Sequence, residues 1–351
     1  MKKLVFRNLE LCKWLVDEKG ANVNEKDKRG QTALIYATLT GHLDLCKWFC
    51  EKMMTDKDTI SLRIEKEIDF TTEKYWKGFW ERTKYKNGTV GLGVFGEDPD
   101  SKSKILAETH TFLWSGKTGN IKDSSVELNL SVQENVTEHD RAFYLIDKNS
   151  GIEFSSDTLV NGYRWERVKN SVLYPLIEEY GLEEYRKMQE AFTKKAYTIG
   201  GMIVFPRKDN AHKKESVNCQ RGAVISDRVD LTIECIRRYF FEETNPLSKM
   251  SDVLEKNGDF FRLFGTGFDG FKAYIDFFFL NDIVSLDYKK VRSFIGTKEF
   301  LEQDAFSTSP FYPKNKEEWL QWKKNAVDFI DKRNQRILTA LRDGTIEKRR
   351  A

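Results

Sequence analysis

Residues 226–240 read Ser-Asp-Arg-Val-Asp-Leu-Thr-Ile-Glu-Cys-Ile-Arg-Arg-Tyr-Phe and carry the clearest helical pattern in the chain. Their apolar side chains recur every three or four positions, at Val229, Ile233, Ile236 and Phe240. This spacing places them along one face of an α-helix. Ser226, just ahead of the pattern, is a residue type that caps helix N-termini. We therefore predict an amphipathic helix that begins at Ser226 and packs its apolar face on a core.

Strands are predicted mainly before this helix and further helices mainly after it. Apolar runs and alternations bounded by turn residues predict strands at residues 60–68, 127–132, 142–146 and 197–205. Helical periodicity predicts helices at residues 173–195, 252–264, 271–284 and 316–342. Asn87-Gly88 is a turn signal, and Pro206 is expected to end the strand before it. This order predicts an α+β fold rather than a doubly wound parallel sheet.

Composition excludes several classes of protein. The chain has 351 residues, a net charge of +3 and 13% aromatic residues, which is too much large apolar surface for wholesale disorder. No apolar run approaches the roughly 18 residues of a membrane span. Arg7 and Glu10 interrupt the start of what resembles a signal peptide. Five cysteines without a Cys-x-x-Cys pair indicate reduced thiols. We expect a soluble, cytoplasmic protein.

A repeat occupies the N-terminus. Residues 8–15 return as residues 42–49, an offset of 34 positions, and residues 30–35 read Gly-Gln-Thr-Ala-Leu-Ile. This pattern resembles the ankyrin repeat, although Ala33 and Ile35 stand where that family has Pro and His. The resemblance covers about one and a half repeats, residues 1–52, and implies either a surface for a protein partner or a helical stub.

So short a segment cannot bury its own apolar face, because repeat arrays are stabilised by stacking on their neighbours. We therefore expect the stub to pack on the mixed domain that follows. Whether further repeats precede Met1 in the natural protein is left open. The predicted organisation is partial ankyrin repeats at 1–52, a polar linker at 53–59, an α+β domain of unknown function at 60–345 and a basic tail at 346–351.

A second resemblance covers about residues 60–340. The sequence contains Trp114-Ser115, Asn218-Cys-Gln-Arg221-Gly222 and, at residues 227–238, Asp-Arg-Val-Asp-Leu-Thr-Ile-Glu-Cys-Ile-Arg-Arg. These motifs resemble an uncharacterised bacterial domain family. In that family a lysine follows Trp-Ser directly, whereas here Lys117 sits one position later. The resemblance implies a domain and no activity or cofactor.

Two phosphate-binding patterns fail on their context. Residues 91–96 spell Gly-x-Gly-x-x-Gly, but an acidic stretch follows where a dinucleotide would need a helix N-terminus. Residues 115–118, Ser-Gly-Lys-Thr, lack the first glycine of a P-loop. The four histidines lie far apart in sequence and predict no metal site.

The best binding candidate is residues 194–228, which carry eight Lys or Arg against three Asp or Glu, a net charge of +5. Within it, Arg221 is expected just ahead of a helix N-terminus, where backbone N–H groups and the helix dipole favour anions. We predict a basic cleft for a phosphate-bearing ligand, a nucleic acid or a nucleotide. The predicted ligand-binding residues are Asn218, Arg221, Gly222, Arg228, Trp114, Ser115, Lys117, Ser155 and Asp157. The alternative is a solvated lysine-rich loop in which Arg221 pairs with Asp227.

Three carboxylates, Asp227, Asp230 and Glu234, are expected on the polar side of the helix at 226–240. Such a group could supply acid and base chemistry or hold a metal, as in a hydrolase or nuclease. The alternative is that Glu234 and Arg238 form an ordinary solvent-exposed pair.

Three functions remain open from the sequence. The first is an ankyrin-linked bacterial domain that binds a phosphate-bearing ligand, with a role in phage defence or toxin systems suggested by association alone. The second is a non-enzymatic protein–protein interaction module. The third is a carboxylate-dependent hydrolase or nuclease.

Overall fold

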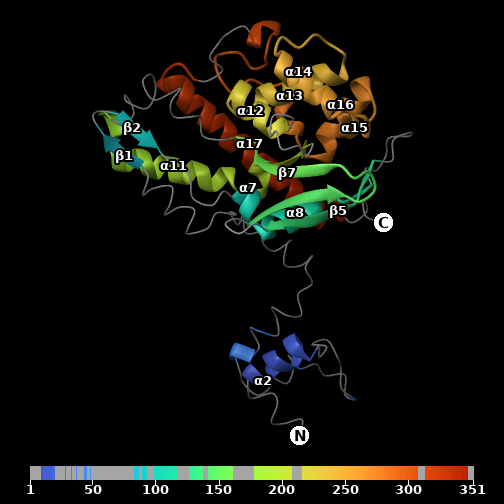
Figure 1. The fold of residues 1–351 in the computed structure, drawn as a ribbon. Coiled ribbons are helices and arrows are strands. Elements are labelled where there is room, and N and C mark those ends of the chain that lie inside the picture. The colour runs from blue at the N-terminus through green and yellow to red at the C-terminus, as the bar shows by residue number, and fades with distance from the viewer. Residues whose placement is uncertain are drawn as a thin grey trace. The chain divides into compact units, whose positions relative to one another are not determined.

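The computed structural model describes residues 9–19, 28, 33, 37, 43–45, 48, 83–86, 89–92, 99–117, 126–136, 141–160, 178–207, 216–306 and 313–346. The chain divides into two compact units, Met1–Arg63 and Ile64–Ala351 (Figure 1). In the first unit, the α-helix α2 (Leu9–Lys13) continues directly into the π-helical turn η1 (Trp14–Glu18). Four of its described apolar side chains are buried: Cys12, Ala37, Leu45 and Trp48.

The second unit contains a four-stranded antiparallel sheet. Its strands are β5 (Leu130–Val136), β6 (Arg141–Asp147), β7 (Glu153–Thr158) and β8 (Met202–Arg207), paired in that order. Two small antiparallel pairs accompany it, β1 (Thr83–Lys86) with β2 (Thr89–Leu92) and β3 (Gly116–Lys117) with β4 (Glu127–Leu128). Strands therefore lie mainly in the first half of the chain, as the sequence predicts.

The turn between β6 and β7 is held by a buried aspartate. The Asp147 carboxylate accepts hydrogen bonds from the backbone N–H groups of Asn129 at 2.6 Å and Ser150 at 2.9 Å. Gly151 has a φ of 75°, the left-handed region that glycine adopts without strain. Asp side chains that satisfy turn N–H groups are typical of tight connections, so the Asp147 carboxylate stabilises the turn between the two strands.

Helices make up most of the remainder. They are α7 (Pro99–Lys102), α8 (Lys104–Trp114), α11 (Leu182–Ala196), α12 (Val217–Ile225), α13 (Val229–Phe240), α14 (Ser248–Lys256), α15 (Gly258–Arg262), α16 (Gly267–Phe277) and α17 (Lys316–Arg342). Short 3₁₀ turns occur at η3 (Ile199–Gly201), η5 (Asn281–Ile283) and η6 (Gln303–Phe306). Figure 1 shows α12 to α16 grouped together on one side of β7.

The core of this unit is rich in aromatic rings. Tyr274 and Phe278 have ring centroids 5.1 Å apart, Phe260 and Phe264 are 5.4 Å apart, and Trp114 reaches Phe278 at 5.3 Å. Pairs of this kind each contribute about 0.5–1.5 kcal/mol beyond their buried area. The 13% aromatic content is therefore used largely to build the helical part of the core.

Arg333 of α17 ties the last helix to earlier parts of the chain. Its Nε donates to the carbonyl of Phe278 at 2.9 Å, and its Nη1 donates to the carbonyls of Gly200 at 2.9 Å and Met202 at 2.7 Å. Burial lowers the pKa of Arg333 to about 9. At Gly200 an added Cβ would lie 2.4 Å from the Ile330 carbonyl oxygen, so only glycine fits beside α17.

The fold class is confirmed as α+β, and several predicted elements are correct. The predicted last helix, residues 316–342, coincides with α17. The strands predicted at 127–132 and 142–146 overlap β4, β5 and β6, and the one predicted at 197–205 overlaps β8 after the turn η3. Pro206 does not end β8, because β8 is an edge strand in which a missing N–H is tolerated. The strand predicted at 60–68 and the Asn87-Gly88 turn lie outside the described residues.

The predicted start of the central helix is wrong. Ser226 does not cap it: Ser226 has a φ of 53° and terminates α12, while α13 begins at Val229 after Arg228. The segment 217–225, predicted to lie ahead of a helix, is itself a helix. Among the described helices, none is both long and apolar enough to cross a membrane.

Candidate functional site

Four of the predicted ligand-binding residues meet between strand β7 and helix α12. Asn218 Nδ2 donates to Ser155 Oγ at 2.8 Å and to the Ser156 carbonyl at 3.1 Å. The Arg221 guanidinium forms an ion pair with Asp157. Ser155 and Asp157 lie two positions apart on β7 and so share the face that α12 covers. Asn218 and Ser155 are 63 positions apart in the sequence, and Arg221 and Asp157 are 64 positions apart. The fold therefore brings together side chains from distant parts of the chain.

Arg221 is completely buried, and protein oxygens accept all of its N–H groups. Nε donates to Thr232 Oγ1 at 2.9 Å, while Nη1 donates to Asp157 and to the Thr158 carbonyl at 3.2 Å. Nη2 donates to the carbonyls of Leu159 at 3.1 Å and Asp227 at 3.3 Å. A guanidinium has five N–H donors, so Arg221 has none left for a ligand. Its ionic partner is Asp157 rather than the Asp227 carboxylate of the alternative interpretation.

A second polar group lies on the opposite face of β7. Trp114 Nε1 donates to His110 Nδ1 at 2.9 Å, and His110 Nε2 lies 3.0 Å from Ser156 Oγ. Because Nδ1 accepts a hydrogen bond, the proton of the neutral imidazole is on Nε2, which donates to Ser156. Burial and the charge of Arg333 lower the pKa of His110 to about 3. In this arrangement His110 cannot take a proton from Ser156, so the pair does not resemble an activated serine.

The remaining predicted ligand-binding residues are held in helices, strands and contacts of the domain itself. Ser115 follows α8, and its Oγ accepts a hydrogen bond from the backbone N–H of Leu130 at 3.1 Å. Lys117 lies in β3, paired with Glu127. Gly222 is buried inside α12. Arg228 precedes α13 and donates from Nε to Asp230 at 3.0 Å.

The three predicted carboxylates are buried, and two have defined cationic partners. Asp230 pairs with Arg228, and its Oδ2 also accepts the backbone N–H of Phe294 at 3.0 Å. Glu234 accepts from Arg237 Nε and from Arg238 Nε, both at 2.8 Å. Asp227 has a φ of 56° in the connection between α12 and α13. The expectation of a solvent-exposed Glu234–Arg238 pair is wrong, since α13 is buried on both faces.

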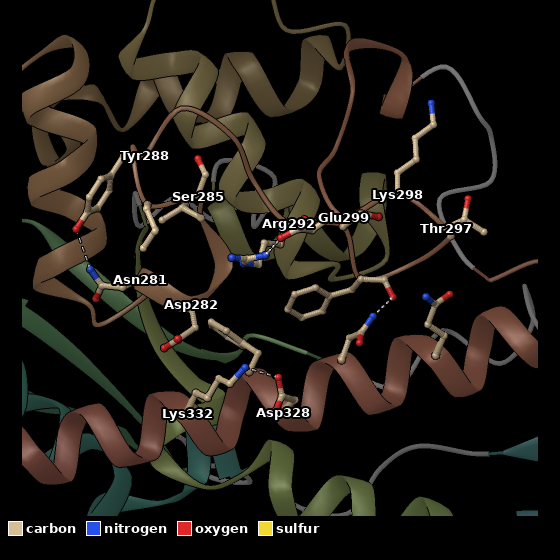
Figure 2. Close-up of a pocket in the computed structure, with 18 of the residues that line it drawn as sticks. Asn281, Asp282, Ser285, Tyr288, Arg292, Thr297, Lys298, Glu299, Asp328 and Lys332 are labelled. Carbon is tan, nitrogen blue, oxygen red and sulfur yellow. Dashed lines mark hydrogen bonds and ion pairs between the residues drawn. The ribbon is translucent and has the colours of Figure 1, made fainter.

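A hollow of about 590 Å³, which we call the α17 groove, lies between the loop at residues 281–299 and helix α17 (Figure 2). Its floor includes Phe294 and Phe329, whose ring centroids are 5.7 Å apart. Charged walls surround the floor. The ion pairs along them are Arg292–Glu299, Lys332–Asp328 at 2.7 Å and Arg336–Asp282.

These ion pairs are mostly exposed to solvent, and surface pairs of this kind contribute only about 0–1 kcal/mol each. A ligand that supplies its own charges can therefore exchange with them at little cost. Tyr288, at one end of the groove, donates to Asp276 at 2.7 Å, and burial is the main cause that raises its pKa. The Arg336 pKa is raised mainly by its hydrogen bond to Asp282. Neither of these two groups changes charge near neutral pH.

No sequence pattern predicts this groove, because it forms where the loop at residues 281–299 meets a helix that comes later in the chain. A lysine and an aspartate four residues apart on α17 look like an ordinary helix pair. Within the described parts of the chain, no group of three or more His, Cys, Asp or Glu side chains could hold a metal ion.

Comparison with known proteins identifies two segments. A model of a family of unknown function (DUF6994) matches residues 55–337, and a model of ankyrin repeats (many copies) matches residues 1–49. No curated protein and no solved structure matches the chain. Both segments agree with the resemblances found in the sequence.

Proposed function

Since the chain belongs to the family of unknown function DUF6994 and carries ankyrin repeats ahead of that domain, we propose that it is a protein-binding adaptor. The observation that carries this proposal is the ankyrin match at residues 1–49. Ankyrin repeats stack into extended binding surfaces, so this segment gives the chain a capacity for protein interaction. The proposal adds that the family domain contributes a polypeptide-binding site of its own, the α17 groove.

The chemistry of the α17 groove supports a polypeptide ligand. The groove offers cations and carboxylates side by side, Lys332 with Asp328 and Arg292 with Glu299, above a floor of two phenylalanine rings. A peptide carries both signs of charge and apolar side chains, so it can replace each exposed ion pair with one across the interface. At the rim, Leu286 is 99% exposed and adds an apolar contact point.

Selection from a displayed library of random dodecapeptides on the full chain tests the groove. We expect enriched peptides to bind Lys332→Glu at least about tenfold more weakly, because reversing one wall charge places two like charges beside each other. The matched control is Lys324→Glu, the same change on an exposed position of the same helix outside the groove. Peptides that bind both variants equally, or no enrichment at all, would show that the groove is not the site.

The ankyrin segment is tested separately in the native cell by proximity labelling with the full chain and with a chain that begins at residue 55. The adaptor proposal expects a set of neighbours that depends on residues 1–49. If the two chains label the same proteins, the ankyrin segment does not recruit a partner.

Binding of a phosphate-bearing ligand, nucleic acid or nucleotide, is the second candidate. With Arg221 fully engaged, this hypothesis depends on Lys208, Lys213 and Lys214, which lie outside the described residues. It predicts nucleic-acid affinity that falls with a log–log salt slope of roughly −0.7 to −0.9 per phosphate contact. If replacing Lys213 and Lys214 leaves nucleic-acid affinity unchanged, the hypothesis of a phosphate-bearing ligand is wrong. The association with phage defence then has no support either. The hydrolase or nuclease hypothesis is weakened in a similar way, because the Asp230 and Glu234 carboxylates already form ion pairs with Arg228 and Arg238.

A further inference from the structure

A second hollow, of about 610 Å³, lies between the end of α13 and helix α14, and nothing in the proposed adaptor function uses it. Arg238, which is 8% exposed, lines it. The Arg238 guanidinium is fixed by Nε donating to Glu234 at 2.8 Å and Nη1 donating to the Thr244 carbonyl at 2.7 Å. The Phe306 ring, with its centroid 5.2 Å from Arg238 Cζ, covers one side. No acceptor among the described residues takes a hydrogen bond from Nη2.

Asn245 lines the same hollow, and the acceptor beside its side-chain N–H is only a thiol. Its Oδ1 accepts the backbone N–H of Leu247 at 3.0 Å, which fixes the orientation of the amide. Its Nδ2 is buried and contacts the Cys235 thiol, with no oxygen or nitrogen acceptor among the described residues. Burial raises the pKa of Cys235 to about 12, so this thiol stays protonated and is a weak acceptor. A buried N–H group paired only with a thiol makes a weak hydrogen bond, which a carboxylate oxygen can replace.

Two N–H donors, one on a buried cation, therefore line a single hollow. A planar carboxylate matches this arrangement, because guanidinium and amide N–H groups can each donate to one of its oxygens. Carboxylates of the protein stand at the rim of the same hollow. Glu242 and Glu255 are exposed there, whereas Glu243 is paired with Arg237. The C-terminal end of α13 also carries partial negative charge, which favours a cation beside it.

We propose that this hollow binds a small zwitterion, a free α-amino acid or a short peptide. Arg238 and Asn245 hold the ligand carboxylate, and Glu242 and Glu255 attract its ammonium group. The rim acids disfavour a dianion such as phosphate, which would bring two negative charges among them. Ser251 and Thr266 supply hydroxyl groups along the wall. The ligand side chain would then lie against the open side of the hollow.

The experiment titrates the full chain with each of the twenty L-amino acids and with Gly-Gly, following binding calorimetrically. Acetate and ethylammonium are half-ligand controls, and inorganic phosphate is the anion control. We expect at least one amino acid or dipeptide to bind, and both half-ligands to bind at least about tenfold more weakly, because each lacks one charged anchor. No binding by any zwitterion, or phosphate or acetate binding as tightly, would overturn the proposal.

Asn245→Asp is the decisive variant, because it keeps the acceptor for Leu247 N–H while replacing the donor with a negative charge. We expect zwitterion binding to fall at least about tenfold, and the melting temperature to fall as well because the new charge is buried. Glu255→Gln should weaken zwitterion binding and leave acetate binding unchanged. Glu184→Gln on α11, an exposed position far from the lining residues in sequence, is the matched control. Binding to Asn245→Asp equal to wild type would contradict the site.

Discussion

Arg221 donates to Thr232, to Asp157 and to three main-chain carbonyls, and so connects β7 to the start of α13. Through this one side chain, β7, α12 and the start of α13 share a single hydrogen-bond network. Its cation is matched by Asp157, whose side chain is only 13% exposed. Removing one partner of such a pair is more damaging than removing both, because a buried charge is left alone.

We predict that Arg221→Met lowers the free energy of unfolding by roughly 3–5 kcal/mol, and that Arg221→Lys also lowers it because a single ammonium cannot reach all five acceptors. Urea unfolding measures both changes. Arg221→Met combined with Asp157→Leu should recover part of the loss. An Arg221→Lys protein as stable as wild type would show that the guanidinium network is not what holds these segments.

The second prediction concerns His110. Its pKa in the folded protein is about 3, against about 6.5 for an ordinary histidine, because burial and Arg333 disfavour its charged form. Below pH 6.5 the unfolded chain therefore takes up a proton that the folded protein does not. The stabilising contribution is present in full above pH 6.5 and is lost as pH falls toward 3, by up to about 1.4 kcal/mol per pH unit.

Unfolding free energies at pH 7, 6 and 5 check this dependence. His110→Gln, which has no titrating group, should show a shallower fall in stability with acid than the wild type. Equal slopes for the two proteins would mean that His110 is not the residue responsible.

At the scale of a helix, the end of α13 carries a residue in an unfavourable conformation. Glu243 N–H donates to the Arg238 carbonyl at 2.9 Å and Glu242 N–H donates to the Tyr239 carbonyl at 3.3 Å, the pattern in which glycine usually follows the helix. Glu242 has a φ of 55° there. We predict that Glu242→Gly raises the unfolding free energy by about 1–2 kcal/mol, measured by urea unfolding, while weakening zwitterion binding. A loss of stability would show that the Glu242 side chain makes contacts that outweigh the strain.

Elements with local signals were predictable and elements without them were not. α17 has a capping residue, Asn315, whose side chain accepts a hydrogen bond from the Glu318 N–H at 2.9 Å. The helix ends beside Gly344, so a residue type typical of a helix boundary marks each of its ends. α12 contains a glycine and has no clear apolar periodicity, and it was missed. Ser226 is a good capping residue by type, but in the fold it is the left-handed residue that ends α12, and its backbone N–H donates to the Arg221 carbonyl.

At the scale of the whole molecule, fold class followed from the order of elements, whereas sites depended on long-range packing. Asn218, Arg221 and Asp157 do lie close together, but their contacts hold β7 and α12 to each other. The α17 groove and the hollow beside Arg238 both depend on segments that meet only after folding. Charge counting over residues 194–228 cannot show that Arg221 is internally paired.

The expectation that residues 1–52 pack on the larger domain stays a prediction. If it is correct, a chain of residues 60–351 should melt at a lower temperature than the full chain, because apolar surface on both sides would be exposed. Thermal unfolding followed by circular dichroism makes the comparison. Identical melting temperatures would mean that the ankyrin segment is independent.

Arg333 has a consequence for the way the protein is made. The carbonyls that it binds, at Gly200, Met202 and Phe278, leave the ribosome before Arg333 itself is synthesised. During translation the core between the sheet and the aromatic helices therefore stays incompletely packed until α17 has been synthesised. A nascent chain stalled before residue 316 should expose its aromatic core to chaperones and proteases, and release of α17 from the ribosome should end that exposure.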